Sequence, residues 1–145
     1  TIGHTFVMRL ETTSTRREPD VMVILNDNPY ELKETLLEGP ADICIEVVSP
    51  ESTARDHGEK FDEYEKGGVL EYWIIDPMRK QARFNRLSEN QVYELIEIGN
   101  SIYSTPLLPD LEIHVDVFWQ DKLPNYMEVA AALQSMLGDN KKKDN

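Results

Sequence analysis

Residues 41–76, with the sequence ADICIEVVSPESTARDHGEKFDEYEKGGVLEYWIID, decide the fold of this chain. They begin with a nearly continuous apolar run, Ile43–Val48, which is typical of a strand buried on both faces of a parallel or mixed sheet. A helix is predicted from about Thr53 to Lys66, and a second apolar strand at Leu70–Ile75. Strand, helix and strand together form a βαβ unit, a crossover that is almost always right-handed.

Length and composition are those of a globular protein with a hydrophobic core. The chain has 145 residues, of which 40% are hydrophobic and 29% charged, and this predicts one domain over residues 1–138. The polar residues 139–145 predict a disordered tail. No stretch approaches the ~18 apolar residues of a membrane helix, and no signal peptide is found, so no membrane partner is expected. Because the chain does not begin with Met, it is expected to be a fragment or a processed product.

The net charge and the cysteine content limit which partners and which cellular location are expected. A net charge of −12 argues against broad, non-specific nucleic-acid binding, which depends on neutralising phosphates. It remains compatible with a local basic cleft, or with acids gathered around a divalent cation. The single cysteine, Cys44, cannot form an internal disulfide, which predicts a reducing, cytoplasmic location.

The segments on either side of the βαβ unit predict a small mixed sheet with a C-terminal β-hairpin and helix. Before the unit we expect strands at Phe6–Glu11 and Val21–Leu25, a polar loop at Thr12–Arg17 and a short helix at Tyr30–Leu37. After it we expect a hairpin of Gln81–Leu87 and Gln91–Ile98, short strands at Ser101–Tyr103 and Leu107–Val117, and a helix at Tyr126–Leu137 that Gly138 ends.

Two carboxylates are the first chemical signal. Glu46 lies inside the buried run, where an unpaired ionised carboxylate costs several kcal/mol or more. Asp20 follows Pro19 at the start of the Val21–Leu25 strand. If the two strands are antiparallel neighbours, the carboxylates lie close together, and their repulsion raises the pKa of one of them. Mg²⁺, or Mn²⁺, would relieve the repulsion, because Mg²⁺ binds one or two carboxylates together with waters.

The predicted helix supplies a second signal. Asp56, Lys60 and Tyr64 follow one another at intervals of four residues and therefore share one helix face. A lysine on a helix that packs beside the Glu46 strand could reach the metal site and orient or activate a water.

Structural explanations compete with each of these assignments. Asp20 could bond backbone groups at the start of its strand. Glu46 could form a buried ion pair with Arg16, Arg55 or Lys60.

The helix residues also have ordinary roles. Asp56 completes an approximate capping box with Thr53, and Lys60 could be solvated or paired with Asp56. Tyr64 is typical of a core or rim aromatic residue, and Glu71 could flank the site or bond loop backbone.

Arg79, Lys80, Arg83 and Arg86 form the main local cluster of basic residues. This cluster could follow a phosphate backbone, although a solvated hairpin face is the favoured interpretation.

The residues that carry these signals resemble a known family. The resemblance covers roughly residues 16–118, and its most specific part is IEVVSPEST-ARD-GEK---Y---GV-EYWIIDP. It is to the Uma-type restriction endonuclease-like proteins, long catalogued as a domain of unknown function, within the PD-(D/E)XK nuclease superfamily. The matching residues are Pro19-Asp20, Glu46-Val47-Val48, Arg55-Asp56, Glu59-Lys60, Tyr64 and Glu71-Tyr72-Trp73.

This resemblance implies a restriction-endonuclease-like α/β fold and Mg²⁺-dependent hydrolysis of DNA. Asp20 matches the acid of the Pro-Asp motif and Glu46 the acid of the (D/E)XK motif. Val48 stands where that motif has its lysine, so Lys60 is the expected substitute, and the Val47 carbonyl would complete the metal shell. Asp56, Tyr64 and Glu71 would be supporting residues, and Arg79, Lys80 and Arg83 would contact DNA.

Two further expectations concern the ends of the domain and the alternatives to nuclease activity. The superfamily core begins with an α-helix, but only five residues precede Phe6, so this helix is expected to be missing or to lie upstream. The strand edges that it would leave predict a homodimer. The alternatives to a nuclease are a catalytically inactive module that binds protein or nucleic acid, and a hydrolase of small phosphate esters.

Overall fold

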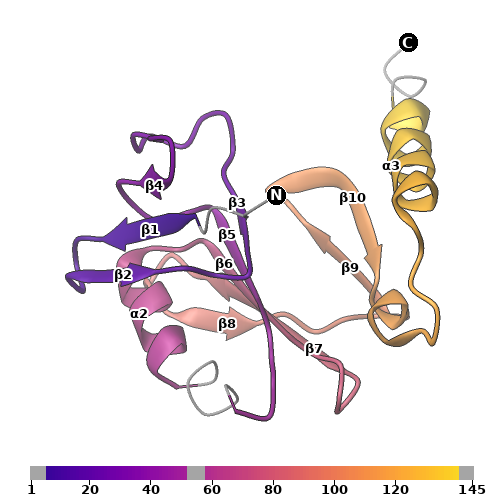
Figure 1. The fold of residues 1–145 in the computed structure, drawn as a ribbon, viewed down its shortest axis with the longest axis horizontal. Coiled ribbons are helices and arrows are strands. Elements are labelled where there is room, and N and C mark those ends of the chain that lie inside the picture. Colours follow the sequence, from indigo (N-terminus) through magenta and orange to yellow (C-terminus); the bar gives the residue numbers. More distant parts are fainter. Residues whose placement is uncertain (1–5, 52–57, 141–145) are drawn as a thin grey trace. The chain divides into compact units, whose positions relative to one another are not determined.

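The computed structural model describes residues 6–51 and 58–140, with side chains through Met136 (Figure 1). It consists of two compact units that divide after Ile96. The predicted α/β class with a mixed sheet is confirmed. The residues before Phe6 lie outside the described part of the chain, so the missing N-terminal core helix stays a prediction.

The first unit contains a three-stranded sheet of order β2-β1-β4 and a five-stranded sheet of order β3-β5-β6-β7-β8. Only β5 and β6 run parallel in the larger sheet, and the other neighbouring pairs are antiparallel. The elements are β1 (Val7–Leu10), β2 (Thr15–Arg17), β3 (Val21–Val23), β4 (Leu36–Leu37), β5 (Ile43–Val47), α2 (Glu59–Gly67), β6 (Glu71–Asp76), β7 (Gln81–Leu87) and β8 (Tyr93–Leu95).

The predicted βαβ unit is formed by β5, α2 and β6. Helix α2 ends at Gly67 because Gly68 adopts a left-handed conformation, with φ 87°, that glycine reaches without a steric penalty. The Gly68 amide then donates to the Glu65 carbonyl at 3.2 Å, and the Val69 amide to the Tyr64 carbonyl at 3.0 Å. These bonds satisfy carbonyls that the helix end leaves open. The predicted first turns of this helix, up to His57, lie outside the described residues.

The hydrophobic core of the first unit is formed by one face of the larger sheet together with residues of α2, β1 and β4. Strand alternation turns Cys44, Glu46 and Val48 to this face, and all three are buried. On the opposite face, Val47 is half exposed, so β5 is not buried along its whole length on both faces. The core cluster comprises Met8, Leu10, Leu37, Ala41, Cys44, Val48, Tyr64, Val69, Tyr72 and Ile74.

Two expectations for the N-terminal segment were wrong. Part of the predicted loop at Thr12–Arg17 is strand β2, which pairs antiparallel with β1. The predicted helix at Tyr30–Leu37 does not form, and β4 at its end pairs parallel with β1. An isolated antiparallel bridge joins Leu32 to Leu37 within this segment. Pairing with β1 thus overrides local helix propensity.

The sequence predicted two strands and one α-helix in the second unit, but residues 115–117 of the predicted second strand belong to a 3₁₀ helix. The second unit is a two-stranded antiparallel sheet followed by this 3₁₀ helix and an α-helix. Its elements are β9 (Ile102–Thr105), β10 (Leu108–His114), the 3₁₀ helix η1 (Val115–Trp119) and α3 (Tyr126–Asn140). Helix α3 continues past Gly138 to Asn140, so the predicted boundary between helix and tail was wrong. Residues 141–145 are not among the described residues.

Among the described residues, no helix has both the length and the apolar character needed to cross a membrane.

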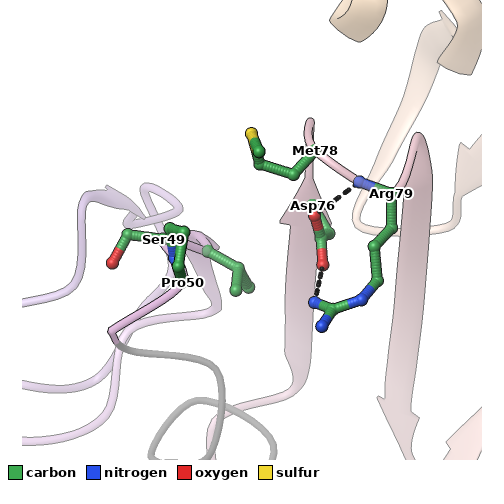
Figure 2. A pocket seen from close by; sticks show the side chains of 6 residues that line it. Ser49, Pro50, Asp76, Met78 and Arg79 are labelled. Carbon is green, nitrogen blue, oxygen red and sulfur yellow. Dashed lines mark hydrogen bonds and ion pairs between the residues drawn. The ribbon is translucent and has the colours of Figure 1, made fainter.

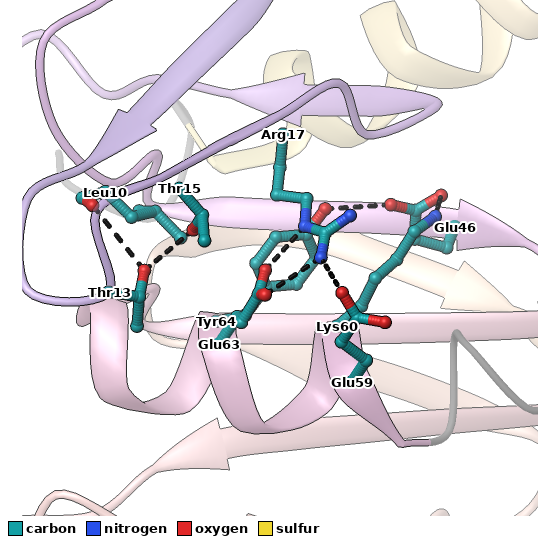
Figure 3. A network of polar contacts seen from close by, with 9 residues as sticks. All are labelled: Leu10, Thr13, Thr15, Arg17, Glu46, Glu59, Lys60, Glu63 and Tyr64. Carbon is teal, nitrogen blue, oxygen red and sulfur yellow. Dashed lines mark hydrogen bonds and ion pairs between the residues drawn. The ribbon is translucent and has the colours of Figure 1, made fainter.

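Arg17 joins the smaller sheet to α2 (Figure 3). Its guanidinium binds both oxygens of Glu63, with Nε to Oε2 at 2.5 Å and Nη2 to Oε1 at 2.8 Å. Nη2 also donates to Glu59 Oε1 at 2.5 Å. A bidentate arginine–carboxylate pair of this kind fixes the relative orientation of the two side chains as well as adding binding energy. Arg17 therefore holds the first turns of α2 against β2.

We predict that Arg17→Met destabilises the protein by on the order of 1 kcal/mol at pH 7, with the loss fading in acid. The hydrogen bond from Arg17 is the main cause that lowers the pKa of Glu63 from its ordinary 4.5. Such a contribution is present above the ordinary pKa and disappears as pH falls through the lowered one. Urea unfolding as a function of pH measures it. The neighbouring Arg16→Met is the control, and equal losses in both variants would contradict the prediction.

Candidate functional site

Glu46 lies at the contact between β5 and the first turns of α2 (Figure 3). Only 2% of the residue is exposed, and each carboxylate oxygen has a partner from α2. Lys60 Nζ lies 2.9 Å from Oε2, and the Tyr64 hydroxyl donates to Oε1 at 2.9 Å. Of the three predicted ion-pair partners, Lys60 is therefore the one observed, while Arg16 pairs with none of the described acids and Arg55 lies outside the description.

The electrostatics of this contact are set by burial. Burial raises the pKa of the Glu46 carboxyl, and the hydrogen bonds and charge of Lys60 oppose the rise. The charge of Asp20 also raises the pKa of Glu46, but by less than burial does. The predicted repulsion between the two acids is therefore present but is not the main cause of the raised pKa. Burial also raises the pKa of Tyr64, which keeps its hydroxyl protonated as the donor to Glu46.

Asp20 comes to the same place from β3. Strands β3 and β5 are antiparallel neighbours, as expected, and Val21 pairs with Ile45, which sets Asp20 opposite Glu46. Asp20 Oδ2 accepts a hydrogen bond from the Val47 amide at 2.7 Å. The predicted bond to backbone is thus present, but to the neighbouring strand. The Val47 group observed beside Asp20 is its amide, and metal binding by its carbonyl stays a prediction.

The register of the sheet extends this site into a row of side chains. Glu46 pairs with Ile74 on β6, and Ile74 with Arg83 on β7. Because residues paired across strands point to the same face of a sheet, Arg83 shares the face of Glu46. The next row on this face contains Val48 and Asp76, whose strands are joined by the bond from the Val48 amide to the Ile75 carbonyl at 2.7 Å.

A hollow of about 290 Å³ opens at this second row (Figure 2). Asp76 and Arg79 both line the hollow, and two hydrogen bonds join them. The backbone amide of Arg79 donates to Asp76 Oδ1 at 2.9 Å, and Arg79 Nη1 donates to Asp76 Oδ2 at 2.8 Å. The bond from Arg79 is the main cause that lowers the pKa of Asp76. The hollow lies where β5 and β6 end, the edge at which open α/β sheets commonly bind ligands. It is lined by Val48, Ser49, Pro50, Asp76, Met78 and Arg79.

The other residues predicted for the site either lie away from Glu46 or are not among the described residues. Glu71 belongs to the opposite face of the sheet, where it binds Arg86 Nε and Trp73 Nε1, each at 2.8 Å. These contacts agree with the structural interpretation favoured for Glu71, and a supporting role in the site stays a prediction. Lys80 is exposed in the turn between β6 and β7 with φ 51°, and Asp56 is not among the described residues.

Sequence reasoning missed three features of this site. It placed Tyr64 on the correct face but did not identify its bond to Glu46, although the four-residue spacing from Lys60 was the signal. It missed the Arg17 contact, for which no local pattern exists, because the partners lie 42 and 46 residues away. It also missed the hollow, since Val48 and Asp76 meet only through strand pairing.

The oxygen donors present suit a hard divalent cation. Asp20 Oδ1 has no hydrogen bond within the described chain, and the Glu46 carboxylate lies in the adjacent register position. One or two carboxylates with waters are sufficient for Mg²⁺. Within residues 6–51 and 58–140, no group of three His, Cys, Asp or Glu side chains is placed to hold a metal, so waters and backbone would have to complete the shell.

We predict that Lys60→Met destabilises the protein more at pH 8 than at pH 5.5. A raised pKa means that ionising Glu46 costs folding stability as pH rises above the ordinary 4.5. Without Lys60 that pKa rises further, at about 1.4 kcal/mol for each unit once the carboxyl is ionised. The control is Lys66→Met, an exposed lysine on the same helix. Urea unfolding at both pH values provides the comparison, and a loss that does not vary with pH would contradict the prediction.

Comparison with known proteins finds a similar fold and a matching family model. One solved structure with a similar fold is that of a "putative nuclease belonging to DUF820" from Anabaena variabilis ATCC 29413, at 17% identity and a TM-score of 0.62. The match covers 81% of this chain and 66% of that one, so this chain spans 66% of that protein's length. No curated protein matches. The Uma2 family model, described as "Putative restriction endonuclease", matches residues 2–116, and the chain therefore belongs to the Uma2 family.

Proposed function

We propose that this protein is a metal-dependent endonuclease that hydrolyses DNA phosphodiester bonds. The observation that carries the proposal is the position of Glu46, buried on β5 opposite Asp20 and bound by Lys60 from the crossover helix. A fold that needed only a packed core would hold an apolar residue there at no desolvation cost. Membership of the Uma2 family supports DNA as the substrate.

Asp20 and Glu46 would hold the cation, with the Val47 carbonyl and waters completing its shell. When bound, Mg²⁺ or Mn²⁺ would supply Lewis-acid polarisation of the scissile phosphate and lower the pKa of a nearby water. Tyr64 holds one oxygen of Glu46 by its hydroxyl, which limits rotation of the carboxylate.

Lys60 is the proposed cationic group of the reaction. Its ammonium lies at the edge of the carboxylate site with 13% of the side chain exposed, so it can orient a water and stabilise negative charge on the phosphate. In the hydrolysis, the water oxygen forms a bond to phosphorus and gives up one proton. The bond from phosphorus to the leaving oxygen breaks, and that oxygen takes up a proton.

We predict that Asp20→Asn and Glu46→Gln each lower Mg²⁺-dependent DNA cleavage by at least about 1,000-fold, equivalent to about 4 kcal/mol. Both variants remove negative charge from the cation site without removing the side chain. Asp62→Asn, which changes an exposed acid on α2, should cleave like the unsubstituted protein. Plasmid nicking, with circular dichroism to verify folding, tests this. Equal nicking by all variants would overturn the site.

The second candidate function is a catalytically inactive module that uses the same fold to bind nucleic acid or protein. Two observations favour it: Val48 replaces the lysine of the motif, and both oxygens of Glu46 already have protein partners. Calorimetric titration with Mn²⁺ separates the two functions. For a nuclease we expect binding that Asp20→Asn and Glu46→Gln each abolish, whereas no binding that depends on these acids favours the module.

A further inference from the structure

We propose that the hollow at the ends of β5 and β6 is a subsite for a nucleotide within a few steps of the cleaved phosphate, with Arg79 and Arg83 binding backbone phosphates on this side. This inference rests on the proposed nuclease function and adds to it the residues that hold the substrate. Arg79 lines the hollow and Arg83 shares the face of Glu46, whereas Lys80 is not among the lining residues and Arg86 lies on the opposite face.

The register places this subsite beside the proposed cleavage site. Val48 and Asp76 lie one row beyond Glu46 and Ile74 on the same face, which is about 6.6 Å along the strands. Arg83 lies in the row of Glu46, two strands away, which is about 10 Å across the sheet. Phosphates of one DNA strand follow one another every 3.4 Å of helix axis, so both distances correspond to a few nucleotides.

Arg79 is arranged to bind an anion. Asp76 holds its Nη1 and its backbone amide, while Nε and Nη2 form no hydrogen bond or ion pair within the described chain. The side chain is 60% exposed, whereas that of Asp76 is 6% exposed. A guanidinium with one nitrogen held and the opposite edge open is preorganised for two hydrogen bonds to a phosphate.

The rest of the hollow suits the apolar part of a nucleotide. Val48, Pro50 and Met78 form its apolar lining, and Met78 is 76% exposed at the turn between β6 and β7. Methionine adapts its shape to irregular partners, and here it lies next to Arg79 in sequence. An apolar wall beside a guanidinium matches a deoxyribose or base joined to a phosphate.

Local charge also favours this surface over the rest of the chain. Lys60 on α2, Arg79 in the turn after β6 and Arg83 on β7 all lie on the side of the larger sheet that carries the proposed cation site. A chain of net charge −12 must gather its cations to bind DNA, because affinity depends on phosphates being neutralised. Together with Asp20, Glu46 and Asp76, these three cations sum to a net charge of zero, so this surface is less negative than the chain as a whole.

The test measures DNA binding by the Asp20→Asn protein, which should not cut, as the salt concentration is varied. Fluorescence anisotropy with a labelled duplex gives the slope of log affinity against log salt. We expect Arg79→Gln and Arg83→Gln each to weaken binding several-fold and to reduce the slope by about 0.9. The control Arg9→Gln, a half-exposed arginine on β1, should leave the slope unchanged.

The possible results separate the subsite from the proposed function. If the protein binds DNA and all three arginine variants share one slope, the subsite is wrong and the nuclease proposal stands. If neither the Asp20→Asn nor the unsubstituted protein binds DNA, both are wrong. Asp76→Asn adds a second readout, because charge alone predicts tighter binding. We expect no tightening, and a smaller effect of Arg79→Gln in that background, whereas clear tightening would overturn the positioning role of Asp76.

Discussion

The burial of the Glu46 carboxylate is the constraint on which this structure depends. A buried acid needs donors for both of its oxygens, and α2 supplies them from two residues one turn apart, Lys60 and Tyr64. The helix therefore cannot slide along the sheet without leaving a charge unpaired. The contact that satisfies the acid also fixes the crossover helix, and it thereby brings a lysine to the acids of β3 and β5.

The direction of the chain explains why the charged groups gather at one end. Helix α2 returns from the end of β5 to the start of β6, so its first turn lies near the strand ends and its last turn near their beginnings. Lys60 therefore meets Glu46, while Tyr64, one turn later, reaches from the core. Asp20 arrives at the same end because β3 runs antiparallel to β5. The connectivity alone thus concentrates these groups where ligands commonly bind in such sheets.

The sequence predicted those parts of the fold that local patterns encode. The β5-α2-β6 unit, the hairpin of β7 and β8, and the shared face of Lys60 and Tyr64 follow from periodicity and turn residues. Strands β2 and β4 did not follow, because they are short and form only by pairing with β1. For Glu71 a structural role was favoured, but its partners Trp73 and Arg86 could not be predicted, because only the register assigns Glu46 and Glu71 to opposite faces.

Val48 stands at the position where the (D/E)XK motif has its lysine, and this has a physical consequence for the proposed site. Val48 is 5% exposed and belongs to the core cluster with Ile74, so an ammonium there would lose hydration among apolar neighbours. Moving the cation to α2 lets position 48 serve the core, but it makes the site depend on how the helix is held. Arg17 holds the same helix turn through Glu59 and Glu63. A contact that looks purely structural thereby controls the distance between the proposed cation of the reaction and its acids.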